Sequence, residues 1–194
     1  MVEPINYADV HTDVPSEALP DIYLAIGSVV LSHTLLEIQM SKVVASITGI
    51  GDRLPGHHLT ANIDAVSKSR IVAAVSSTFK SNPLGMIEDF KPLPDVAQRL
   101  DRLRKLFDSI SETRNVLAHG AVGYHGERLV MGSIQASTML RASGGTEKWV
   151  YLDTVDDTHR DIQEALSLST RICADFDGAY AASRRAEARD RKDN

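Results

Sequence analysis

The residues best suited to chemistry are Arg114, Asn115 and His119. Histidine exchanges protons near neutral pH more readily than any other side chain. Arginine carries a fixed positive charge whose forked donors match a crowded phosphate, and lysine imitates it poorly. An asparagine one helical turn before the histidine can orient the imidazole or a substrate hydroxyl. The trio could therefore combine proton transfer with stabilisation of an anionic centre.

These three residues lie at the end of a helix that the sequence predicts over residues 95–118. Apolar residues recur upstream in alternating steps of four and three, which indicates one buried stripe: Val96, Leu100, Leu103, Phe107 and Ile110. Arg114 is the next position on that stripe, where burial of an unpaired charge costs several kcal/mol or more. Gly120 is typical of the residue just past a helix. We therefore expect His119 at the helix end, able to turn back toward Arg114 and Asn115. Alternatively, His119 caps the last carbonyls and Arg114 forms a structural ion pair.

The six residues Arg114-Asn115-Val116-Leu117-Ala118-His119 resemble the motif of the HEPN superfamily, in which Arg and a polar residue precede His by a three-residue spacer. The resemblance implies an all-helical, metal-independent endoribonuclease-like domain with no cofactor, cleaving RNA by attack of the 2′-hydroxyl. Arg114, Asn115 and His119 would be its catalytic residues. It also implies a homodimer with the motif near the two-fold axis, a toxin or phage-defence setting, and a cognate antitoxin or inhibitor protein. Position 121 is Ala, so the branch of the family with a modified tyrosine there is not supported.

A second function stays open beside the first. The chain could be a non-catalytic dimeric helical module that binds protein or nucleotide, with Arg114, Asn115 and His119 as a structural polar network. A solvent-open, electropositive cleft at the motif would favour catalysis, whereas a sealed ion pair of Arg114 with an acid would favour the structural interpretation.

The acid that we expect beside Arg114 lies on a helix predicted over residues 21–48. Its apolar stripe is interrupted by His33, with Glu37 one turn later. Glu37 is the carboxylate that flanks this stripe in the middle of the helix, so we predict that it pairs with Arg114 or Asn115 and that His33 supports the site. The order of His33 and Glu37 is opposite to that of di-iron bundles, and no metal is predicted.

The remaining segments complete a mainly α fold. A second helix is expected over 61–79 with Thr60 as its cap, and a fourth over about 154–184, where Thr154 and Asp157 form a capping box. Between the third and fourth helices, apolar and polar residues alternate, which predicts a small antiparallel β-meander over about 121–154. The expected architecture is a four-helix HEPN-like bundle with this meander between the third and fourth helices. Residues 1–20 are expected to be irregular, 21–184 to form the domain, and 185–194 to be a charged, disordered tail.

The composition fits a soluble globular chain. Of the 194 residues, 43% are hydrophobic and 24% charged. The net charge of -5 argues against a strongly electrostatic nucleic-acid binder but leaves a local basic groove open. Cys173 is the one cysteine, so no intrachain disulfide can form. The acidic, proline-containing start does not resemble a signal peptide, and the longest uninterrupted low-polarity run, 25–31, is shorter than a membrane span. We therefore expect a cytoplasmic protein without a membrane partner.

Overall fold

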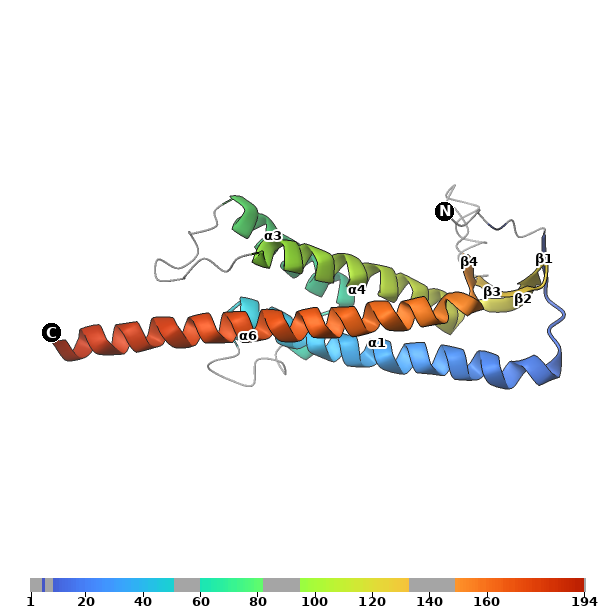
Figure 1. The fold of residues 1–194 in the computed structure, drawn as a ribbon, viewed down its shortest axis with the longest axis horizontal. Helices are drawn as coiled ribbons and strands as arrows, with labels where there is room; N and C mark the ends of the chain where they lie inside the picture. The colour runs from blue at the N-terminus through green and yellow to red at the C-terminus, as the bar shows by residue number, and fades with distance from the viewer. Residues whose placement is uncertain (1–4, 6–8, 51–59, 82–94, 133–148, 194) are drawn as a thin grey trace. The chain divides into compact units, whose positions relative to one another are not determined.

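The computed structural model describes residues 5, 9–50, 60–81, 95–132 and 149–193. The chain is mainly helical, with four long helices and a small antiparallel sheet whose last three strands lie between the third and fourth of them, which confirms the predicted fold class (Figure 1). In chain order the elements are β1 (Val10–His11), α1 (Leu19–Ile47), α3 (Ala65–Ser81), α4 (Val96–His119), β2 (Ala121–His125), β3 (Arg128–Gly132), β4 (Trp149–Tyr151) and α6 (Val155–Asp193).

The chain divides into two compact units. One comprises residues 1–34 and 109–162, and the other comprises residues 35–108 and 163–194. The three divisions between the units, at 34/35, 108/109 and 162/163, fall inside α1, α4 and α6, so each of these helices contributes residues to both units. The single domain expected over 21–184 stays a prediction.

In the unit of residues 35–108 and 163–194, all four helices pack together as a bundle. The core is formed by the inward stripes of the helices, including the predicted stripe of α4 from Val96 to Phe107, whose residues are at most 3% exposed. Burial of such aliphatic and aromatic side chains is the main source of stability. The helices are joined by the Ser76–Asp101 hydrogen bond (2.8 Å), the Arg99–Asp175 ion pair (2.5 Å), the edge-to-face rings of Phe79 and Phe176, and the bond from Tyr180 to the Ile47 carbonyl (3.4 Å).

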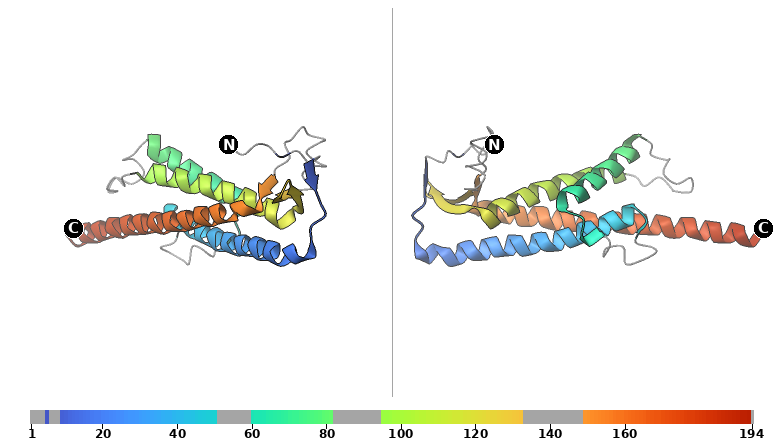
Figure 2. Two further views of the ribbon diagram at one scale, coloured as in Figure 1. Left: turned by 45° about the vertical axis from the view of Figure 1, so that its right-hand side comes forward. Right: turned by 180° about the vertical axis from the view of Figure 1, so that it is seen from behind.

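The unit of residues 1–34 and 109–162 holds the sheet. Its four strands follow the order β1-β2-β3-β4, and every neighbouring pair is antiparallel. Figure 2 shows the ribbon, including the sheet, from two further sides. Gly132 and Trp149 are paired across β3 and β4, and a side chain at Gly132 would meet the Trp149 ring at 2.3 Å. The Trp149 indole therefore packs directly on the backbone of Gly132, where any side chain would collide with the ring. The predicted strand over 138–142 lies outside the described residues.

The helix boundaries largely follow the sequence pattern. The predictions for α1 and α4 are confirmed within two residues at each end. The predicted cap of the second helix is wrong: α3 begins at Ala65, and its cap is Asp64, whose carboxylate accepts from the backbone N–H and the hydroxyl of Ser67. Thr60 instead donates from a buried position to the Ser41 carbonyl.

Both ends of the chain differ from expectation. Val10 and His11 form a short strand against β2, in a segment that the sequence pattern describes as irregular. Helix α6 begins after a 3-10 turn over Leu152–Thr154, and the Thr154 hydroxyl donates to the Tyr151 carbonyl. The helix then continues to Asp193, past the expected boundary at 184. Alanine and arginine, both strong helix formers, dominate this extension.

Helix α1 is apolar over a longer stretch than the uninterrupted low-polarity run 25–31. The segment Ser16–Ile47 is long and apolar enough to cross a membrane, with a mean hydropathy of 1.4 in its best window. Core helices of soluble proteins and signal sequences share this length and composition. The cytoplasmic location and the absence of a membrane partner stay predictions.

Candidate functional site

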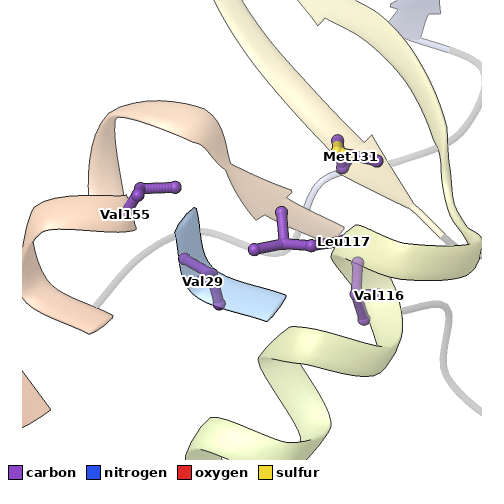
Figure 3. Packing of buried hydrophobic residues seen from close by; sticks show 5 residues of the cluster. All are labelled: Val29, Val116, Leu117, Met131 and Val155. Carbon is purple, nitrogen blue, oxygen red and sulfur yellow. The ribbon is translucent and has the colours of Figure 1, made fainter. Parts of the chain in front are cut away.

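The end of helix α4 is anchored by the two residues that follow Asn115. Val116 and Leu117 belong to a buried cluster with Val29 of α1, Met131 of β3 and Val155 of α6, as Figure 3 shows. Each of these five side chains is at most 7% exposed. Two of the three spacer residues of the motif are thus part of the core, and they fix the direction in which the flanking polar residues leave the helix.

Gly120 ends the helix where the sequence predicts, but for a steric reason. Its φ is not in the left-handed region that favours glycine at a C-terminus. A Cβ at this position would lie 2.4 Å from the Val116 carbonyl oxygen and 2.8 Å from that of Gly132. Only glycine therefore allows the last turn of α4 to approach β3 so closely, and this contact holds His119 at the end of the helix.

The structure brings two residues of the trio together and leaves the third open. Arg114 Nη1 donates to Asn115 Oδ1 at 3.0 Å. Asn115 and His119 are exposed, whereas Arg114 is half-buried. His119 is the last residue of α4, and it makes no hydrogen bond within the described part of the chain. Its imidazole is therefore accessible to a ligand from solvent.

Arg114 has a donor that its own surroundings do not use. Its Nε atom is buried and has no hydrogen-bond partner among the described residues. A buried donor without an acceptor costs about 1–3 kcal/mol, so such groups are rare in folded proteins. Among the described residues, the hydrogen-bonding capacity of the Arg114 guanidinium is therefore not fully satisfied.

His33 lies beside the motif helix, and its supporting role stays a prediction. It is 3% exposed, and its Nε2 lies 3.0 Å from the Ser111 hydroxyl, one turn before Asn115. The sequence analysis did not single out Ser111, although its position four residues before Asn115 was a usable signal. Glu37 is half-buried and belongs to the other unit, so its pairing with Arg114 stays a prediction.

A serine and a histidine from distant segments meet elsewhere in the same unit, a contact that the sequence did not indicate. His159 Nε2 lies 3.0 Å from the Ser28 hydroxyl. The Ser28 hydroxyl also donates to the Ala25 carbonyl at 2.8 Å. The contact joins α6 to α1.

Two other types of candidate group are a thiol and a cluster of metal-ligating side chains. Burial raises the pKa of the Cys173 thiol, which disfavours the reactive thiolate and agrees with a packing role. In the part of the chain that the structure describes, no group of three or more His, Cys, Asp or Glu side chains could hold a metal ion.

The chain was compared with known protein families, curated proteins and solved structures. No family model, curated protein or solved structure matches the chain.

Proposed function

We propose that this chain is a metal-independent endoribonuclease-like domain resembling the HEPN type, acting as a toxin or phage-defence effector. The observation that carries the proposal is the arrangement at the end of α4. An accessible imidazole at His119 lies five residues from a half-buried guanidinium whose buried Nε lacks an acceptor in the described part of the chain. A proton-exchanging group and a positioned cation are the two components that RNA cleavage without metal requires.

The chemistry follows from the ribose 2′-hydroxyl. Its oxygen attacks the adjacent phosphorus, so a bond from phosphorus to O2′ forms while the bond to O5′ breaks. The 2′-hydroxyl gives its proton to a base, and the leaving O5′ takes a proton from an acid. His119 supplies one of these two transfers. Arg114 stabilises the charge on the pentavalent phosphate, and Asn115 orients the hydroxyl or the guanidinium to which it is bonded. The products carry a 2′,3′-cyclic phosphate and a 5′-hydroxyl.

The decisive experiment incubates the purified protein with a defined single-stranded RNA in excess chelator. We expect fragments ending in a cyclic phosphate, and no cleavage of the DNA oligonucleotide of the same sequence, which lacks the nucleophile. His119→Ala should lower the rate by about 10²–10⁴-fold. Arg114→Lys should also lower it, because lysine cannot offer the forked donors. His11→Ala is the matched control, since His11 is an exposed histidine on β1.

The outcomes separate catalysis from a structural role. If His119→Ala is folded and cleaves as fast as the parent, the histidine is only a helix cap and the proposal is wrong. The alternative, a non-catalytic module that binds protein or nucleotide, is favoured by the internal Arg114–Asn115 hydrogen bond. Intact RNA at high protein concentration, together with a lower melting temperature for Arg114→Lys, would support that module.

A further inference from the structure

Helix α1 presents a second apolar stripe that no described part of the chain covers. Four aliphatic side chains on it are between 50% and 73% exposed: Leu24, Leu31, Leu35 and Ile38. With Gly27 they occupy an arc of about 80° on the helix surface. Between Asp21 and Glu37 the helix carries no Asp, Glu, Lys or Arg, and its one histidine there, His33, is buried. A continuous exposed apolar face of this kind marks an interaction surface.

The positions of this stripe are arranged symmetrically about Leu31. Leu24 and Ile38 each lie seven residues from Leu31, and Gly27 and Leu35 each lie four residues from it. When two copies of such a helix lie antiparallel with Leu31 at the centre, each position meets its mirror position at the same height along the axis. A two-fold interface requires this self-complementarity, because the same patch contacts itself.

Gly27 leaves a notch in the stripe, that is, a position without a side chain, although its own chain leaves room for one. A glycine inside a helix weakens it relative to alanine. A Cβ at Gly27 would meet no atom within 4 Å, and its φ is ordinary. In the antiparallel arrangement this notch faces Leu35 of the second copy. A large side chain opposite a glycine is the complementarity expected of a closely packed helix pair.

The charges at the ends of the stripe match in the same arrangement. Asp21 lies ten residues before Leu31 and Lys42 eleven residues after it, and both are exposed. Asp21 of one copy is therefore within about one residue, roughly 1.5 Å along the axis, of Lys42 of the second copy. The two residues also lie on the same side of the stripe. A parallel pair would bring each of these charges against its own like charge instead.

We propose that this face of α1 binds the same face of a second copy, antiparallel and centred on Leu31. A lipid surface fits the face less well, because interfacial helices carry a lysine- and arginine-rich polar face. Here Lys42 is the one basic residue of α1 and the opposite face forms the core, with Ile22, Val29 and Leu36 buried. The pairing depends on α1 and needs no catalytic role for Arg114.

Light scattering tests the proposal with the full chain. The parent should have twice the chain mass of 21.2 kDa, and Leu31→Glu should have the chain mass, because two carboxylates would meet at the axis. Val66→Glu is the matched control, since Val66 is 59% exposed on α3 and lies outside the stripe. Gly27→Leu should also dissociate the dimer while the chain stays folded, because its own chain leaves room for the side chain.

Charge exchange tests the register. Asp21→Lys and Lys42→Asp should each weaken the dimer roughly tenfold, and the double exchange should restore it. A parent that is monomeric, or a Leu31→Glu variant that stays dimeric, overturns the proposal. Flotation of a monomeric parent with phosphatidylcholine vesicles, lost in Leu31→Glu, would assign the face to lipid and overturn it as well. RNA cleavage does not enter any of these readouts.

Discussion

Replacing Gly120 with alanine should destabilise the chain because the new methyl group has no room. Its carbon would lie 2.4 Å from the Val116 carbonyl oxygen and 2.8 Å from that of Gly132. Carbon and carbonyl oxygen normally approach to about 3.3 Å, so the end of α4 or strand β3 must move by about 0.5–1 Å. Overpacking of this kind costs about 1–3 kcal/mol. For a chain of this size the melting temperature should fall by roughly 2–12 °C.

The assay is thermal unfolding followed by far-ultraviolet circular dichroism, with Gly178→Ala as the matched control. Gly178 lies inside helix α6, and a Cβ there would meet no atom within 4 Å. The same substitution should therefore stabilise the helix by about 0.5–1 kcal/mol. One glycine-to-alanine change should lower the melting temperature and the other should raise it, although both remove the same backbone freedom from the unfolded chain.

A functional measurement extends this test to the candidate site. Displacing the last turn of α4 displaces His119, the last residue of that helix. If His119 transfers protons, a misplacement near 1 Å should slow cleavage by about 10²-fold even where the variant remains folded. A Gly120→Ala variant as stable as the parent would refute the close approach of α4 to β3. Unchanged cleavage by a destabilised variant would show that the position of His119 does not matter.

Two further predictions concern polar contacts outside the motif. Tyr151→Phe removes the hydroxyl that lies 3.0 Å from His125 Nδ1, so we expect a loss of about 0.5–1.5 kcal/mol in the free energy of unfolding, measured by urea denaturation. Hydrogen bonds from Lys80 and Ser76 lower the pKa of Asp101 below its ordinary value of 3.8. Its carboxylate therefore stabilises the fold above that pH, and the contribution is lost as the pH falls through the lowered pKa. Asp101→Asn should make stability less sensitive to pH in this acidic range, and an unchanged acid profile would contradict the coupling.

The sequence predicts the helices well because their apolar spacing reflects burial in a core. The stripe of α4 and the position of its end follow from residue types alone, since Ile110 and Leu117 are buried and Gly120 follows His119 directly. A hydrogen bond joins Arg114 to Asn115, and the joint action of the polar residues of the motif stays a prediction. Local pattern and tertiary structure agree in this part of the chain.

Features that depend on distant partners were not predictable in this way. Thr60 and Asp64 are both good cap residues, and the choice between them is made by the Ser41 carbonyl, which accepts from Thr60 at 2.7 Å. Strand β1 has two residues, too few for an alternating pattern, and it exists because β2 offers an edge to pair with. The contact of His33 with Ser111 likewise depends on how two helices are aligned.

Helix α1 shows why burial cannot be derived from hydrophobicity alone. Its inward stripe contains Ile22 and Val29, and its outward stripe contains Leu24 and Leu31, so both faces are equally apolar in sequence. A periodicity analysis assigns the first apolar stripe it finds to the core and leaves the second without a partner. An apolar face that remains exposed after folding is costly in water, and a protein retains it when association covers it. Under the pairing proposed above, the second face of α1 is covered in the assembly, and a single chain displays it only as exposed aliphatic side chains.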